Sequence, residues 1–144
     1  MIKIYTKKET LTDAERIRLE EIMFYNFIMY LFKTNSNPAK VYGFVEVICT
    51  LGNCDLLIIN NVVSMCMSQD YRYVPRQQEH IYLLTKSSTP VRKVTAQFSI
   101  SQRDYYKIKN SDPPDIQPKF SPKQYIEIIK FMDCLTKLIP ERIR

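Results

Sequence analysis

The sequence predicts an α+β fold, namely a curved antiparallel sheet of four or more strands with an N-terminal helix and an amphipathic C-terminal helix. Helix-capping patterns stand near both ends of the chain, and apolar residues alternate with polar ones in the middle. At 144 residues and 45% hydrophobic content, the chain suits one domain with one core. We therefore expect a single domain over 1–144, with the N-terminal helix in 1–39, antiparallel strands in 40–110 and the C-terminal helix in 120–140.

The N-terminal helix is predicted from a capping box. Thr12 supplies the N-cap, and Glu15 stands three residues later. From Ile22 to Phe32 nearly every residue is apolar or aromatic, so this part must be covered on most sides. A core helix and an interface between protomers both fit that pattern. The segment TNSNP, residues 34–38, is expected to end the helix.

The strands are predicted from alternation. In VYGFVEVICT, residues 41–50, apolar side chains fall on both faces of a strand, and Gly52-Asn53 provides a turn to a return strand within 55–67, whose register stays open. After a polar connector over 68–78 come a short strand at 80–86 and a long alternating segment over 91–108. The length of the last segment predicts a projecting ribbon or a bend.

The C-terminal helix has the clearest start signal in the chain. It follows a proline-containing loop over 109–119, and Ser121, Pro122 and Gln124 form an N-cap, a first helical proline and a capping box. Its apolar stripe follows helical spacing, and Pro140 is expected to end it. The stripe consists of Tyr125, Ile128, Ile129, Met132, Leu135 and Ile139.

Little in the composition favours catalysis or metal binding. The single histidine, His80, lies in a predicted strand, and the sequence contains no glycine-rich phosphate loop or nucleophile elbow. The four cysteines show no CxxC spacing and are predicted to be buried thiols. We therefore predict no enzyme, no cofactor and no metal. The cysteines are Cys49, Cys54, Cys66 and Cys134.

No segment has the character of a secretion signal or a membrane anchor. The N-terminus lacks the apolar stretch of a signal peptide, and the most apolar run, Ile22 to Phe32, is shorter than the roughly 18 residues needed to cross a bilayer. The sequence thus predicts an intracellular protein of a reducing compartment, nuclear or cytoplasmic, that is neither secreted nor membrane-bound.

The positive charge belongs to the second half of the chain. Residues 1–71 carry seven Lys/Arg and eight Asp/Glu, a net charge of −1, whereas residues 72–144 carry fourteen and seven, a net charge of +7. Such an asymmetry favours a polyanionic partner for the second half, although a solvated basic surface gives the same count.

Cations and aromatic residues interleave within this basic half. Cations that follow phosphates and aromatics that stack on bases are the two groups by which proteins bind single strands. An ordinary half-buried sheet with lysines on its outer face fits the same pattern. The cations are Arg92, Lys93, Arg103, Lys107 and Lys109, and the aromatics are Tyr71, Tyr73, Tyr82, Phe98, Tyr105 and Tyr106.

Three motifs follow one another within residues 79–140, namely Arg103-Asp104-Tyr105-Tyr106, a loop ending Gln117-Pro118-Lys119, and the helix start from Phe120 to Tyr125. In this order they resemble the positive cofactor four family of single-stranded-DNA-binding transcriptional coactivators. The resemblance implies a curved sheet, dimerisation through the C-terminal helix, a phosphate contact at Arg103 and a stacking platform at Tyr106, with Lys86, Arg92 and Lys93 on the adjoining ribbon. The family's glycine and lysine cluster before the helix is missing, and residues 1–75 match nothing in the family.

The function predicted from these observations is binding of single-stranded or melted nucleic acid, without strong sequence specificity, in transcription or replication. The partners expected are single-stranded nucleic acid, a second copy of the chain and the transcription or replication machinery. The predicted binding residues are Lys86, Arg92, Lys93, Arg103, Tyr106, Lys107 and Lys109. The alternative is a protein-interaction module, for instance a viral factor that engages a host protein through its apolar helix or through the loop over 71–75.

Overall fold

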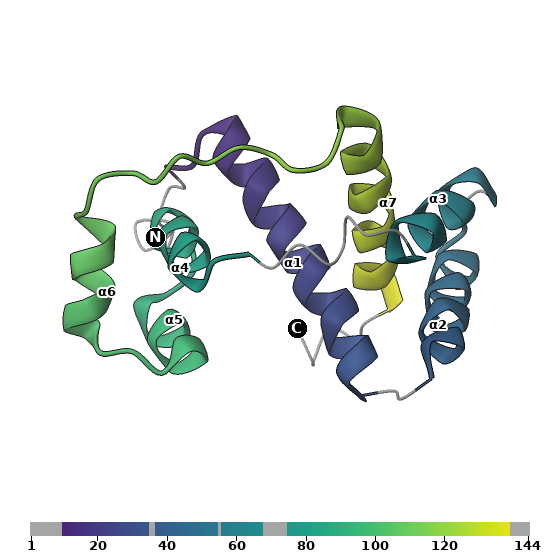
Figure 1. The fold of residues 1–144 in the computed structure, drawn as a ribbon, viewed down its shortest axis with the longest axis horizontal. Coiled ribbons are helices and arrows are strands. Elements are labelled where there is room, and N and C mark those ends of the chain that lie inside the picture. The colour runs from purple at the N-terminus through teal and green to yellow at the C-terminus, as the bar shows by residue number, and fades with distance from the viewer. Residues whose placement is uncertain (1–9, 35–36, 55, 68–74, 139–144) are drawn as a thin grey trace, which may run out of the picture. The chain divides into compact units, whose positions relative to one another are not determined.

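The structure, a computed structural model, describes residues 10–34, 37–54, 56–67 and 75–138 (Figure 1). Within these ranges all regular structure is helical, and no strand is present. The predicted α+β class, with its curved antiparallel sheet, is therefore wrong. The helices are α1 (Asp13–Thr34), α2 (Pro38–Leu51), α3 (Leu56–Met67), α4 (Gln77–Lys86), α5 (Val91–Phe98), α6 (Gln102–Lys109) and α7 (Pro122–Leu138).

The chain forms two compact units. Unit 1 combines Met1–Leu19 with Pro75–Lys119, and unit 2 combines Glu20–Val74 with Phe120–Arg144. Helix α1 thus contributes its first turns to unit 1 and the remainder to unit 2. In unit 1, α4 contacts α5 and α6, and these two also contact each other; in unit 2, α2, α3 and α7 contact one another.

The two terminal helices begin where the sequence predicts. Glu15 accepts a hydrogen bond from the Thr12 N–H at 2.9 Å, and the Glu15 N–H donates to Thr12 Oγ1 at 3.2 Å. Ser121 and Gln124 form the same reciprocal pair at the start of α7, with distances of 3.0 and 3.2 Å. Both predicted capping boxes are confirmed, because each needs only residues three positions apart.

The strands predicted over 41–67 are instead α2 and α3. Asn37 caps α2 by accepting from the Ala39 N–H at 3.0 Å, and Pro38 occupies the first turn. In both helices the buried residues recur at i, i+4, i+7 and i+8, which is one face of a helix. They are Val41, Val45, Ile48 and Cys49 in α2, and Ile58, Val62, Met65 and Cys66 in α3.

The predictions of a strand at 80–86 and of a ribbon over 91–108 are also wrong. The first is part of α4, and the second is divided into α5 and α6 by three residues. Val94, Ala96, Phe98 and Ile100 alternate with polar residues as a strand would require, but Ala96 is exposed whereas Val94 is fully buried. The loop predicted over 109–119 is confirmed from Asn110 onward, which follows the end of α6.

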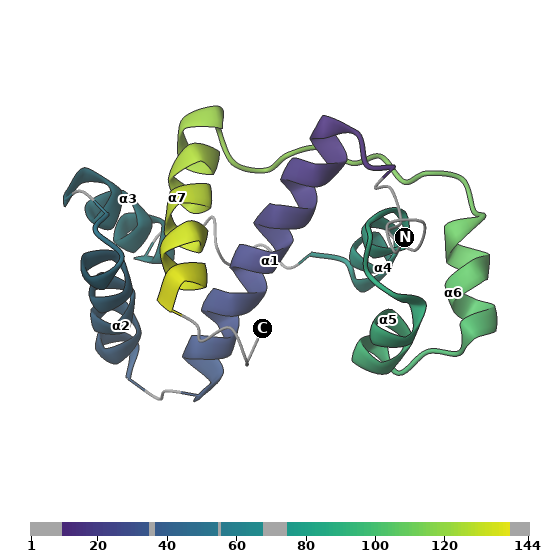
Figure 2. The ribbon, with the colours of Figure 1, turned by 180° about the vertical axis from the view of Figure 1, so that it is seen from behind.

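In unit 2, α7 lies between α1 and the pair α2–α3 (Figure 2). Aromatic rings and aliphatic side chains from these helices form the core of the unit. Phe24 of α1 lies edge-on to Phe131 of α7 at a centroid distance of 5.8 Å and to Phe120 at 6.3 Å. The buried carboxylate of Glu21 accepts from the Phe120 N–H at 3.0 Å, next to the start of α7. The core-helix interpretation of residues 22–32 therefore holds for one face of α1, while Met23, Met29 and Tyr30 are exposed.

Two of the four cysteines are joined. Cys54 and Cys134 form a disulfide that links the end of the α2–α3 turn to α7, across 80 residues of sequence. Gly52 lets α7 approach, because a Cβ at that position would clash with Cys134 Cβ and lie 2.8 Å from its Sγ. The prediction of four buried thiols is thus confirmed for Cys49 and Cys66, whose burial raises the pKa to about 11 and about 12, and is wrong for the other two.

Thiol titration checks the disulfide directly. In denaturant without reductant the chain should show two thiols, from Cys49 and Cys66, and after reduction it should show four. Because the bond closes a long loop, its reduction should also destabilise unit 2 by about 2–4 kcal/mol in urea unfolding. Four thiols in freshly purified, unreduced protein would contradict this prediction.

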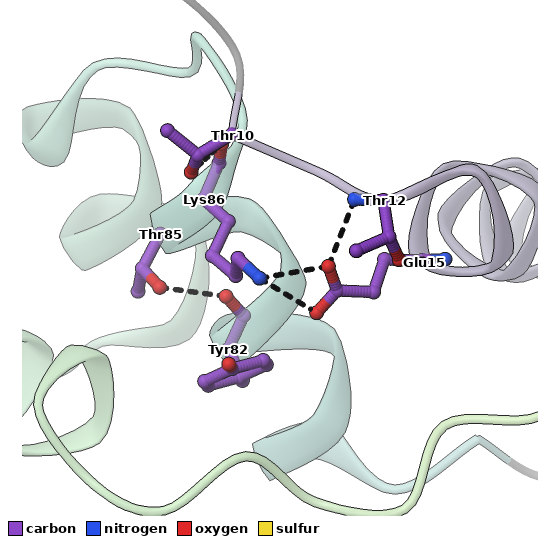
Figure 3. A network of polar contacts seen from close by, with 6 residues as sticks. All are labelled: Thr10, Thr12, Glu15, Tyr82, Thr85 and Lys86. Atoms are coloured by element: carbon purple, nitrogen blue, oxygen red, sulfur yellow. Dashed lines mark hydrogen bonds and ion pairs between the residues drawn. The ribbon is translucent and has the colours of Figure 1, made fainter.

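Unit 1 is built around α4, whose residues 79–85 are all buried. At its N-terminal end Glu79 pairs with Arg18 of α1 at 2.9 Å, and both side chains are buried. At its C-terminal end Lys86 donates to both oxygens of Glu15 at 2.7 and 2.9 Å, while the Lys86 carbonyl accepts from Thr10 (Figure 3). Two ion pairs therefore fasten the first turns of α1 to α4.

None of the helices in the described ranges has both the length and the apolar character required to cross a membrane.

Candidate functional site

In unit 1, α5 and α6 form a pair of short helices, most of whose residues are exposed to solvent. Eight residues of α5 and eight of α6 are joined by three residues, Ser99 to Ser101, and the two helices run in clearly different directions (Figure 1). Both rest on the buried helix α4. Two short helices joined by a tight turn and supported by a third form the helix-turn-helix arrangement.

The turn is specified by its own residues. Ser99 ends α5 in the left-handed region, with φ 53° and ψ 45°, and the Ile100 N–H donates to the Thr95 carbonyl at 3.1 Å. Ser101 then caps α6, because its Oγ accepts from the Asp104 N–H at 3.1 Å. A left-handed residue followed two positions later by an N-cap turns the chain sharply from one helix into the next.

Helix α6 divides into an inner and an outer face. Tyr105 is 2% exposed and Val94 of α5 is fully buried, and these side chains belong to the unit's core. Burial and the neighbouring Tyr106 raise the pKa of Tyr105, so its hydroxyl remains neutral. The inner face thereby fixes the rotation of α6 about its axis, and with it the residues that point outward.

The outer face of α6 carries polar, cationic and aromatic groups. Gln102 and Arg103 stand exposed in its first turn, and Tyr106 follows one turn later at 44% exposure. The Tyr106 ring lies edge-on to Tyr105 at 5.0 Å, and Lys109 Nζ sits 5.8 Å from the Tyr106 centroid. These side chains project from a helix held by its other face, which suits insertion into a groove.

The predicted cations fall into three places. Arg92 and Lys93 are exposed in the first turn of α5, and Arg103 and Lys107 are exposed on α6. Lys86 differs from them, because Glu15 pairs with it and Tyr82 lies below it, and the Glu15 hydrogen bond raises its pKa. Lys86 therefore has a structural partner within the protein already.

Three hollows flank the helix pair. Lys107 and Asp104 line one of about 450 Å³ between α6 and α4, which shares Gln77, Gln78, Ile108 and Ser111 with a neighbouring hollow of about 630 Å³. Lys86 and Lys109 line a third, of about 390 Å³, beside the end of α6. The structure thus places Lys86 and Lys109 beside one hollow, whereas Arg103 and Tyr106 lie on the outer face of α6.

His80 is a core residue of unit 1. Its ring lies edge-on to Phe98 at 5.0 Å and is 7% exposed. Desolvation lowers its pKa from 6.5 to about 4, with smaller opposing effects from Glu79, which raises the pKa, and Arg18, which lowers it. A buried, neutral imidazole in contact with a phenyl ring serves packing in this position.

Acidification should destabilise unit 1 through His80. Its folded pKa of about 4 lies below the unfolded value near 6.5, so the unfolded chain binds the proton more readily and stability falls as pH drops below about 6.5. Between pH 7 and pH 5 the loss should be about 2 kcal/mol in urea unfolding, and His80→Leu should remove most of that pH dependence. An equal loss in the variant would contradict this origin.

Among the residues that the structure describes, no group of three or more His, Cys, Asp or Glu side chains is placed to hold a metal ion.

Sequence reasoning missed Gln102 and the turn itself. Ser101-x-x-Asp104 is a capping signal of the same kind as those that correctly placed α1 and α7, and Val91, Val94 and Phe98 have helical spacing. These signals lie inside a segment in which four apolar residues, at positions 94, 96, 98 and 100, alternate with polar ones. A test of both periods over 91–108 would have found the two helices.

No protein-family model, curated protein or solved structure matches this chain, and none of these comparisons identifies it with the positive cofactor four family.

Proposed function

We propose that unit 1 binds double-stranded DNA, with α6 in the major groove, in transcription or replication. The observation that carries this proposal is the rotation of α6: Tyr105 is buried against the unit while Gln102, Arg103 and Tyr106 point outward. In helix-turn-helix proteins the second helix enters the major groove, and its N-terminal residues contact base edges.

The positions of the aromatic residues favour double-stranded DNA over a single strand as the ligand of unit 1. A single strand needs several exposed rings on which bases stack. Tyr82 and Tyr105 are buried and Phe98 is half-buried, so Tyr106 is the exposed ring among the predicted aromatics in the described residues. Tyr71 and Tyr73 lie outside those residues. The single-strand prediction remains a prediction, but the sheet on which it relied is absent from the described fold.

Base and phosphate contacts are assigned by position. Arg103 has the planar fork that binds guanine O6 and N7, and Gln102 has the amide that pairs with adenine N6 and N7. Arg92 and Lys93 stand in the first turn of α5, where cations are unfavourable unless an anion neutralises them, and Pro90 provides no side-chain cap there. A DNA phosphate supplies the anion at the N-terminus of α5. Lys107 and Lys109 of α6 lie beside the major groove of the DNA.

The first experiment selects preferred sequences from a random duplex library and then measures affinity for the selected duplex, an unrelated duplex and each single strand. We expect the selected duplex to bind at least about 1,000-fold more tightly than the unrelated one. Four phosphate contacts should give a log–log salt slope of about −3.6 on duplex DNA, from −0.9 per contact. Equal affinity for all sequences, or tighter binding to single strands, would overturn the proposal.

Two variants of Arg103 separate charge from shape. Arg103→Ala should lower affinity for the selected duplex by about 10–100-fold. Arg103→Lys should retain the salt slope but lose much of the sequence preference, since an ammonium lacks the bidentate fork. Lys123→Ala is the matched control, because it removes one exposed positive charge from α7 in unit 2 and should change affinity less than threefold. Similar losses in Arg103→Ala and the control would argue against a role for α6.

A further inference from the structure

The strongest unused surface is an apolar face on α2 and the start of α3. Phe44, Val47 and Leu51 are 53%, 53% and 63% exposed, and their spacing places them on one side of α2. Leu56 and Leu57, just beyond the turn, are 71% and 63% exposed. We define these five residues as the α2 face; they are half of the large hydrophobic side chains that are exposed in the described residues.

The glycine on this face is unexplained by the fold of a single chain. Gly43 lies within α2, one residue before Phe44, and a Cβ built there meets nothing within 4 Å. Glycine inside a helix lowers stability relative to alanine, and neither a turn nor a close contact within the protein requires it here. Close approach of another helix backbone is a reason for a glycine at such a position.

The charge of this region indicates which partner fits. Helices α2 and α3 carry two charged residues, Lys40 and Glu46, both of them exposed on α2, and Lys40 lies one turn before Phe44 on the same side of the helix. A strongly acidic or basic partner finds no excess of the opposite charge on such a surface, because the two charges cancel. Two copies of a chain with net charge +6 repel each other elsewhere, but they can meet at this surface, where the single cation and the single carboxylate of α2 balance.

We infer that the α2 face is the interface of a symmetric homodimer. A twofold axis sets the same patch of each copy against the other, and an apolar patch with one cation and one carboxylate meets that requirement. Five side chains more than half exposed offer roughly 400–500 Å² per copy, so that two copies bury roughly 800–1,000 Å², at the lower bound for a specific interface. This inference concerns unit 2 and does not depend on DNA binding by unit 1.

The test is the mass of the full chain in solution without DNA, by light scattering and sedimentation at about 5–200 µM. The wild-type chain should approach 34.2 kDa, which is 2 × 17.1 kDa, and Val47→Glu should weaken self-association at least about 100-fold and give a mass near 17.1 kDa. Ile126→Glu on α7 is the matched control, because Ile126 is also 53% exposed, and it should remain a dimer.

Each other outcome counts against the inference. A wild-type monomer over the whole range shows that two copies do not pair, and loss of the dimer in both variants moves the interface to α7. A dimer that survives Val47→Glu, with helicity unchanged by circular dichroism, places the interface elsewhere on the chain. Because no DNA is present, failure of the proposed DNA binding leaves all of these results unaffected.

Discussion

Replacing Arg18 with methionine is expected to lower the free energy of unfolding by about 3–5 kcal/mol, because it removes one partner of a buried ion pair. Arg18 Nη2 lies 2.9 Å from Glu79 Oε1, and the two side chains are 1% and 5% exposed. Methionine keeps much of the apolar stem but removes the cation, so the Glu79 carboxylate stays buried without its charged partner. Urea unfolding followed by circular dichroism measures the loss.

Two further variants establish that burial of the pair causes this effect. Arg16→Ala breaks an exposed pair on the same helix, with a distance of 3.8 Å to Asp13, and should cost less than about 1 kcal/mol. Arg18→Met combined with Glu79→Leu should be more stable than Arg18→Met alone, because no unpaired charge then remains. If Arg18→Met behaved like Arg16→Ala, the buried pair would not hold α1 to α4.

The sequence predicted the ends of the fold correctly because the signals there are local. A capping box needs one hydroxyl and one carboxylate or amide three residues apart, as in Thr12 with Glu15 and Ser121 with Gln124. No distant residue has to be known for such a pair to form. The loop between α6 and α7 was equally predictable, since its prolines exclude regular structure whatever surrounds it.

The middle of the chain was mispredicted because its apolar residues satisfy two periods at once. Val41, Val45, Ile48 and Cys49 have helical spacing, but the intervening Phe44 and Val47 are also apolar and complete an alternating pattern. The many β-branched residues favour strands in isolation. Packing of α2 against α3 and α7 stabilises the helix, and no short stretch of the sequence reveals these tertiary contacts.

The candidate site shows the same limit on a smaller scale. Charge and composition directed attention to Arg103 and Tyr106, which lie exposed on α6 and whose predicted role in binding stays a prediction. They did not reveal that Lys86 is paired with Glu15, because those residues are 71 positions apart. Nor did they separate Tyr105 from Tyr106: adjacent residues on a strand point to opposite faces, and on a helix they lie about 100° apart, so only the rotation of α6 decides which is buried.

These adjacent tyrosines therefore offer a sharp contrast between folding and binding. Tyr105 is 2% exposed, and Tyr105→Ala should destabilise unit 1 by about 3–5 kcal/mol through the cavity that it leaves. Tyr106 is 44% exposed, and Tyr106→Ala should cost less than about 1 kcal/mol, mostly from lost contacts with the Tyr105 ring and Lys109. Thermal unfolding of both variants at one pH measures the difference.

Binding should follow the opposite order once folding is taken into account. At a temperature where Tyr106→Ala is fully folded, its affinity for the selected duplex should fall about 10-fold, because Tyr106 projects from the face of α6 assigned to the groove. Tyr105→Phe, which keeps the buried ring, should bind as the wild-type chain does. Loss of binding in Tyr105→Phe together with unchanged binding in Tyr106→Ala would mean that the opposite face of α6 meets the DNA.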